Sequence, residues 1–417
     1  PAETLTHWQT VHGVTGLSEQ ELAPYFEERE RRLNVIKWEV PPNANNDKLK
    51  QGCEKLNIPW HSIPRNVNGC WNLGYCGLGC PTNAKQSMLV TTIPQALKNN
   101  AQLIYQARAW KLINEGGAIK GVVCQAMNDD RVTTTGVTIE IRAQNTIMAC
   151  GGISGPGLML RSKLPDPYKR IGKRTFLHPV PFSMAIFPEK VDGYWGAPQS
   201  VYSDHFVWKD GATGPMGFKL EVSPLQPGLV GGLIGGFGTE LREAMSQLPY
   251  IHSMIALLRD GFHPESEGGN VILRDDETPV VESYPFNDYL RDGIRRALLT
   301  LAELQFAAGA QKVRPSNNQA PFYTSWVQAK EAIPRLPLER ITQRLGCAHV
   351  MGGCAMGEDP KTSVVNSEGK FHHLDNLYVF DGSMFPTSIG ANPQFSIYGI
   401  VAKHTQGLLK KLGKAVA

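Results

Sequence analysis

The sequence predicts a mixed α/β (α+β) protein built from two interleaved units, and three observations support this prediction. At 417 residues, the chain exceeds the length of one ordinary domain of about 100–200 residues. A β-type stretch occupies residues 101–149, and apolar residues recur at helical spacing over 289–308 and 395–412. We place the boundaries at 1–164, 165–335 and 336–417, with the last segment returning to the first unit.

The N-terminal part combines a helix with long loops. Ser18 followed by Glu21 is a capping-box signal, so we expect a helix over Ser18–Asn34, broken near Pro24. Residues 40–100 are rich in Pro, Gly, Asn and Cys, which is typical of ordered loops over a site. They end in a helix-like run at Ile93–Leu97.

Short strands and one long helix are expected in the middle of the chain. Turn residues separate the β-type runs of the first unit, which are Leu103–Tyr105, Ala109–Ile113, Gly121–Cys124, Gly136–Ile141 and Thr146–Ala149. From about Pro165 the composition changes to Pro-, Gly- and aromatic-containing strands, among them His178–Phe182 and Gly193–Gly196. Tyr289–Ala308 has the apolar period of a helix.

Composition excludes some classes of partner. A net charge of +4 and a pI of 8.6 are too mild to favour nucleic acid, and no long basic run occurs. No apolar stretch reaches the ~20 residues that a membrane-spanning helix needs. We therefore expect neither nucleic acid nor a transmembrane segment, and the sequence leaves the compartment open, cytoplasmic or periplasmic.

The most informative stretch is C-terminal. A loop at 347–357 carries His349 beside a glycine pair, and a second segment runs from Asp381 to Gln394. Apolar spacing after residue 394 predicts a helix with Asn392 as its N-cap and Pro393 at its first position. Such a helix start presents unpaired N–H groups and a positive dipole end. The pattern indicates a base next to an anion-stabilising helix end.

These segments resemble the signature of the glucose–methanol–choline (GMC) flavoprotein oxidoreductases. Further stretches agree with the resemblance, namely 76–87, 145–160, 270–273 and 307–310. The resemblance implies an FAD-binding domain interleaved with a sheet-containing substrate domain over 165–335. The segment His178–Phe206 is most similar to bacterial choline-dehydrogenase-like proteins and long-chain alcohol oxidases. Members of this family open with a βαβ unit carrying G-x-G-x-x-G. The 417 residues hold no such motif, so we expect an incomplete FAD-binding domain that lacks its N-terminal Rossmann βαβ unit.

The resemblance also implies the catalytic residues. His349 would take the hydroxyl proton of an alcohol as a neutral imidazole base while hydride leaves for the flavin N5 atom. Asn392 would hydrogen-bond the alcohol oxygen and orient its carbon. The alternative for Asn392 is a plain N-cap.

Several residues are expected at the FAD. The family pattern puts Asp381 and Gly382 near the pyrophosphate or ribityl chain, although a simple tight turn explains the pair equally well. The helix starting at Pro393 would point at the flavin pyrimidine, and Ala109 matches a backbone position against adenine. The expected cofactor-binding set is Ala109, Gly151, Asp381, Gly382, Asn392, Pro393 and Gln394.

Cys70, Cys76 and Cys80 form a C-x5-C-x3-C pattern in a Gly-rich loop. Three such thiolates can hold a cluster, and the spacing resembles that of GMC subunits that pass electrons to a cytochrome through a 3Fe–4S cluster. Buried free thiols or a disulfide are the alternatives, and zinc would need a fourth ligand such as Cys53.

The sequence therefore predicts an FAD-dependent enzyme that oxidises a small-molecule alcohol to an aldehyde or ketone. One alternative is a dehydrogenase that relays electrons through the cysteine cluster to a cytochrome or another acceptor. Another is an inert fragment without the nucleotide fold. Four aromatic residues suggest an apolar substrate cavity: Trp195, Tyr202, Phe206 and Trp208.

Overall fold

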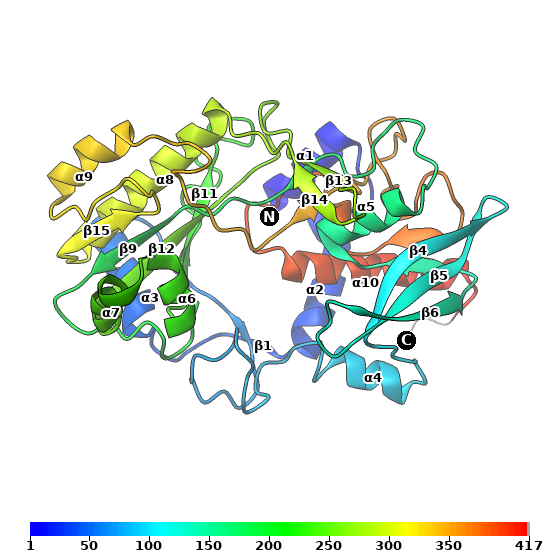
Figure 1. The fold of residues 1–417 in the computed structure, drawn as a ribbon, viewed down its shortest axis with the longest axis horizontal. Coiled ribbons are helices and arrows are strands. Elements are labelled where there is room, and N and C mark those ends of the chain that lie inside the picture. Colours follow the sequence, from blue (N-terminus) through cyan, green and yellow to red (C-terminus); the bar gives the residue numbers. More distant parts are fainter. Residues whose placement is uncertain (235, 415–417) are drawn as a thin grey trace.

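The computed structural model describes residues 1–234 and 236–414, which form two lobes that lie side by side (Figure 1). One lobe is organised around a six-stranded sheet, and the other around a parallel strand pair, a three-stranded sheet and packed helices. Each lobe encloses its own apolar core. The fold is of the mixed α/β class that the sequence predicts.

The six-stranded sheet is antiparallel throughout, with the strand order β15-β9-β12-β11-β10-β2. Its strands are β2 (His61–Ser62), β9 (Phe182–Ile186), β10 (Val201–Ser203), β11 (Phe218–Val222), β12 (Ile251–Leu258) and β15 (Lys312–Pro315). Long α8 (Asp288–Ala307) and α3 (Ala44–Lys55) contribute to the core against this sheet.

The two faces of the sheet differ in chemistry. Phe218, Leu220 and Val222 of β11 belong to the core shared with α8. Side chains alternate along a strand, so Lys219 and Glu221 lie on the opposite face, where they pair across strands with Leu257 and Ile255. This second face carries the polar residues that matter for function.

The other lobe places two strand ends at one edge. β7 (Thr146–Met148) and β17 (Leu377–Val379) are parallel. α5 (Gly151–Arg161) follows the first strand, and the 3-10 turn η3 (Gly382–Met384) follows the second. Both connections therefore leave the carboxyl edge of the strand pair, where open α/β sheets bind their ligands.

The remaining elements surround these sheets. α10 (Gln394–Lys411) packs against α2 (Glu19–Arg32), next to α1 (Ala2–His12). The three-stranded sheet consists of β4 (Ala107–Glu115), β5 (Ala118–Met127) and β6 (Thr134–Arg142). Smaller elements are β1 (Val35–Ile36), β3 (Arg65–Asn66), α4 (Thr92–Lys98), β8 (Thr175–Phe176), α6 (Pro227–Ile234), α7 (Gly238–Ser246), η1 (Leu248–Tyr250), β13 (Asn270–Leu273), β14 (Pro279–Glu282), α9 (Trp326–Ala332), η2 (Ile333–Arg335) and β16 (Met351–Gly352).

Several local predictions are wrong for identifiable reasons. α2 is not broken at Pro24, because the capping box of Ser18 and Glu21 fixes its start and buried Leu22 anchors it. Leu103–Tyr105 is exposed and irregular, since Gln106 has a positive φ and the strand starts after it. His178–Pro181 precedes β9 with an isolated bridge of Val180 to Gly346 in place of a strand, because its two prolines lack the N–H groups that a ladder requires. Gly193–Gly196 is a turn rather than a strand.

Candidate active site

The glycines of the loop that carries His349 bring this loop close to strand β8. β16 pairs with β8, bringing Gly352 opposite Thr175. Gly352 has a φ of +78°, and a β-carbon there would lie 2.0 Å from the Arg174 carbonyl oxygen. Only glycine allows this approach. Gly352 of the glycine pair therefore lets the His349 loop pack directly on the backbone of Arg174.

His349 faces a second histidine that the sequence analysis missed. The Nδ1 atoms of His178 and His349 lie 3.0 Å apart. His178 is fully buried with a φ of +50°, and its backbone N–H donates to the Asp260 carboxylate at 3.2 Å. Tyr284 donates its hydroxyl to the same Asp260 oxygen at 2.6 Å. No local pattern reveals this role, because the partners of His178 come from distant parts of the chain.

Asn392 is held by an ion pair on the second, polar face of the six-stranded sheet. Its Oδ1 accepts from the Lys219 ammonium at 2.9 Å, and its Nδ2 donates to the Glu221 carboxylate at 3.3 Å. Lys219 and Glu221 lie 2.7 Å apart, and the Glu221 side chain is only 1% exposed. Gln199 donates to Glu221 at 2.7 Å. Asn392 therefore belongs to a partly buried, charged hydrogen-bond network.

The predicted helix start is corrected by one residue. α10 begins at Gln394, and Pro393 occupies the N-cap position without a side-chain cap. Asn392 is therefore not the N-cap, and its amide is engaged by Lys219 and Glu221 instead. A proline cannot donate a backbone N–H, and the first α10 bond runs from Ile397 N to the Pro393 carbonyl. The N–H groups of the first α10 turn remain directed out of the helix end.

The electrostatics keep both imidazoles neutral near pH 7. Burial lowers the pKa of His349 below its usual 6.5, while the Glu221 carboxylate raises it and Lys219 lowers it. Burial lowers the pKa of His178 far more, with further contributions from His349 and Lys219. Within residues 1–234 and 236–414, no group hydrogen-bonds Nε2 of His349. A neutral imidazole with an open nitrogen can accept a proton.

The carboxyl edge of the parallel strand pair holds the other predicted residues. One Asp381 oxygen accepts from the Gly151 backbone N–H at 2.8 Å, and the other accepts from Ser383 N–H at 2.7 Å. Asp381 thus ties the end of β17 to the start of α5. Gly151 has a φ of +77° with open space where a β-carbon would lie. Gly382 packs against Ile397 of α10, so this edge and the α10 start lie together.

The other predicted residues lie in separate surroundings. Ala109 is in β4, opposite Cys124, and packs at the edge of the core of its lobe. Gln394 is exposed. Of the four aromatic residues, only Tyr202 adjoins the site, with the Lys219 ammonium 4.4 Å from its ring. Phe206 stacks on Phe218, Trp208 packs on Arg259, and Trp195 is exposed.

The predicted iron–sulfur site is not supported. Throughout the described part of the chain, no three His, Cys, Asp or Glu side chains are grouped to hold a metal ion. Each thiol has a separate partner: Cys70 accepts from Asn72 N–H, Cys76 from Arg65, and Cys80 contacts the Thr82 hydroxyl. Each sulfur contacts a different protein group, so the three cysteines are close in sequence but do not point to one common site. Cys53, considered as a fourth ligand, is buried in the core of the lobe that contains the six-stranded sheet.

The helices of the described residues include none that is both long and apolar enough to cross a membrane.

Comparisons with known proteins show which family this chain resembles. The N-terminal and C-terminal family models of the GMC oxidoreductases match residues 1–180 and 264–400. A long-chain-alcohol oxidase of Arabidopsis thaliana is 26% identical over 99% of this chain and 56% of its own length. An uncharacterised GMC-type oxidoreductase of Mycobacterium tuberculosis is 27% identical over 97% and 61%. The chain thus spans about three fifths of the length of these relatives.

Solved structures show the same fold. A pyridoxine 4-oxidase from Mesorbium loti superposes with a TM-score of 0.64 at 15% identity, covering 98% of this chain and 80% of that one. A formate oxidase variant from Aspergillus oryzae RIB40 gives a TM-score of 0.71 at 14% identity, covering 99% and 82%. The N-terminal family model covers residues 1–180 and does not bear out the predicted incomplete domain. The chain belongs to the GMC oxidoreductase family.

Proposed function

We propose that the protein is an FAD-dependent oxidoreductase that oxidises the CH–OH group of a small-molecule alcohol to an aldehyde or ketone. One observation carries the proposal. A neutral imidazole with an open nitrogen, His349, and an amide, Asn392, are assembled around the buried Lys219–Glu221 pair at the start of α10. The relatives named as long-chain-alcohol oxidases support the same class of substrate.

The residues present fit an FAD. The carboxyl edge of β7 and β17 offers Gly151, which has open space where a β-carbon would lie, and the start of α10. Unpaired N–H groups and a helix dipole at such an edge favour a negatively charged group. Asp381, Gly382, Pro393 and Gln394 would line this side, as the sequence predicts, and Ala109 would stand further along the cofactor. When bound, FAD supplies the hydride acceptor.

His349 would act as the base. For its Nε2 to accept the hydroxyl proton, Nδ1 must carry hydrogen and donate to His178 Nδ1, which lies 3.0 Å away. The positive charge that then forms on His349 would be stabilised by the Glu221 carboxylate, which already raises its pKa. His178 would hold the ring in this tautomer and orientation, because its backbone N–H is held by Asp260 and its side chain is fully buried.

Asn392 would position the alcohol oxygen. Its Nδ2 uses one hydrogen for Glu221 and has a second available for the substrate. Lys219 and Glu221 fix the amide orientation from both sides, so the donor is in place before substrate binds. A positioned donor of this kind contributes by orienting the reacting C–H bond. The domain boundaries predicted from sequence remain part of this proposal.

The proposal is tested by anaerobic stopped-flow reduction of the flavin in the full-length protein, with a series of alkanols as substrates. His349→Ala should retain flavin and slow its reduction by about 10²–10⁴-fold, the usual contribution of general-base catalysis. His373→Ala, at a half-buried histidine that packs beside Tyr168 and Phe371 outside this site, is the matched control and should reduce at the wild-type rate. An unchanged rate in His349→Ala would remove His349 from this role, and a full-length protein without flavin would contradict the proposal as a whole.

A further inference from the structure

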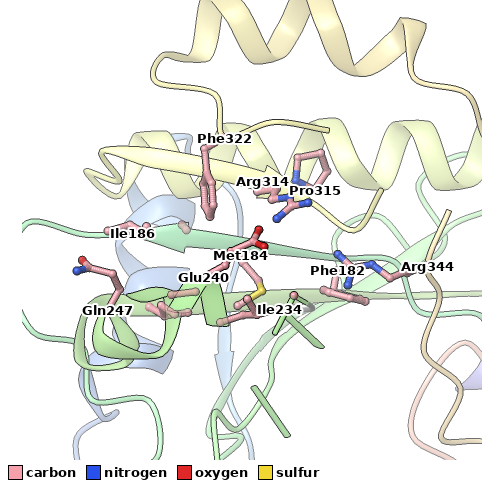
Figure 2. A pocket seen from close by; sticks show the side chains of 14 residues that line it. Phe182, Met184, Ile186, Ile234, Glu240, Gln247, Arg314, Pro315, Phe322 and Arg344 are labelled. Carbon is pink, nitrogen blue, oxygen red and sulfur yellow. The ribbon is translucent and has the colours of Figure 1, made fainter. Parts of the chain in front are cut away.

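A second cavity, outside the His349 site, combines unpaired cations with an apolar wall. It has a volume of about 430 Å³ and lies between α6–α7 and the strands β9, β12 and β15 (Figure 2). Cavities of this size suit small organic ligands. Its charged side chains are Arg314 from β15, Arg344 from the segment before the His349 loop, and Glu240 from α7.

Each of the two arginines has more N–H donors than its hydrogen bonds to the protein use. Arg314 donates Nε to the Ala320 carbonyl oxygen at 3.0 Å, and Arg344 donates to the Leu233 carbonyl oxygen. Nε of Arg344 is buried without a partner. In the part of the chain that the structure describes, no carboxylate lies within ion-pair distance of either guanidinium group. Burial and the charge of Arg314 both lower the pKa of Arg344, so the two like charges act on each other.

The rest of the cavity is mostly apolar. Phe182, Met184 and Ile186 project from β9 on the face that also carries Arg314, which pairs with Met184. Ile234 and Phe322 complete the wall. The guanidinium groups stand over two of these rings, Arg344 at 5.9 Å from Phe182 and Arg314 at 5.8 Å from Phe322. Planar cations fixed over aromatic rings keep their edges free for an anion.

We propose that this cavity binds a carboxylate attached to an apolar body, with the carboxylate held between Arg314 and Arg344 and the body against Phe182, Met184 and Ile186. A carboxylate matches the fork of donors that a guanidinium offers. Such a ligand relieves the repulsion of two half-buried like charges and removes apolar surface from water.

The bound carboxylate can belong to the substrate or to a separate molecule, and the position of the cavity allows an experiment to distinguish these two cases. Glu221, Ile255 and Phe182 are direct cross-strand neighbours on adjacent strands. Two strand spacings put the cavity wall about 10 Å from the Asn392 network. The carboxylate is therefore either the far end of a hydroxy acid whose hydroxyl reaches His349, or a separate molecule.

Glu240 allows a test in which different substitutions are expected to change the affinity in opposite directions. Its carboxylate shares the cavity and would compete with a bound anion for the arginines. Glu240→Gln should therefore tighten binding, whereas loss of either arginine should weaken it. Arg242→Gln, on the exposed side of the same helix, removes one charge without touching the cavity and is the matched control.

Decanoate is the probe, and binding to the full-length protein is measured by calorimetry. Arg314→Gln and Arg344→Gln should each weaken binding by about 10- to 100-fold, as expected for a charge-assisted hydrogen bond worth roughly 1.5–3 kcal/mol. Glu240→Gln should strengthen it and Arg242→Gln leave it unchanged. Arg344→Lys keeps the charge and should recover part of the affinity, which separates anion binding from a loss of folding. No decanoate binding to wild type, or equal binding to all variants, would overturn the site.

Kinetics then separate the two sources. If the carboxylate belongs to the substrate, Arg344→Gln should lower kcat/KM for ω-hydroxydecanoate relative to decanol. If it belongs to a separate molecule, that ratio stays constant while decanoate binding is lost. Because binding needs no turnover, a protein that binds decanoate but oxidises neither compound would support the cavity and count only against the proposed function.

Discussion

At the scale of single residues, a substitution at Asn392 distinguishes a contribution to catalysis from a contribution to helix stability. Its amide contacts Lys219 and Glu221 rather than the N–H groups of α10. Asn392→Ala should therefore slow flavin reduction by roughly tenfold, about 1.4 kcal/mol for one orienting hydrogen bond. The substitution should not cause the loss of ~1 kcal/mol of stability that follows removal of an N-cap. Stopped-flow rates and the melting temperature are measured together, and a fall in stability with an unchanged rate would favour the capping role.

The pH dependence of flavin reduction follows from the environment of His349. Burial lowers its pKa below 6.5, and a base must be neutral to accept a proton. The reduction rate should be flat above pH 6.5 and fall as the pH drops through the lowered pKa. Glu221→Gln removes the carboxylate that raises this pKa, so the falling limb should move to lower pH. A limb that moves upward would contradict the electrostatic assignment.

At the scale of elements, α10 shows how one substitution can have opposite effects within one helix. Gly407 faces open space, whereas a β-carbon at Gly399 would lie 2.3 Å from the Phe26 ring of α2. Gly407→Ala should stabilise the protein by about 0.5–1 kcal/mol, because alanine loses less backbone entropy in a helix. Gly399→Ala should destabilise it by about 1–3 kcal/mol through overpacking. Thermal melting of both variants checks the prediction, and shifts of the same sign would contradict this packing.

Elements also show what the sequence could and could not provide. Helices with clear caps and apolar period, such as α2 and α8, are predicted to within about a residue at most ends. His349 and Asn392 stand in a local motif and could be named in advance. Lys219 and Glu221 were visible only as polar positions alternating with apolar ones in β11, and His178 had no signal. Their roles depend on strand pairing and on contacts between residues far apart in sequence, which local patterns do not encode.

At the scale of the whole molecule, the two lobes are joined at the functional site. The Lys219–Glu221 pair comes from the six-stranded sheet, while Asn392 leads into α10 of the other lobe. Each lobe has its own core, so the site depends on how the lobes are held together. A change that weakens this junction is expected to affect the reaction before it unfolds either core.

Buried histidines should make the stability of the whole molecule depend on pH. His252 and His404 are buried, and burial lowers their pKa to about 3 and about 4. Between these values and the ordinary 6.5, the unfolded chain binds protons that the folded chain does not. Stability is therefore fully present above pH 6.5 and falls as the pH drops from 6.5 towards 4.

One of these histidines can be removed to test the account. His404 packs on Phe380, and neither ring nitrogen has a hydrogen-bond partner among residues 1–234 and 236–414. His404→Leu should flatten the pH dependence of the free energy of unfolding by up to about 1.4 kcal/mol per pH unit in this window, since one fewer proton is taken up on unfolding. His61→Leu, at an exposed histidine, should leave the slope unchanged. Denaturant titrations at pH 7, 6, 5 and 4 measure it, and equal slopes in wild type and His404→Leu would show that His404 carries no such linkage.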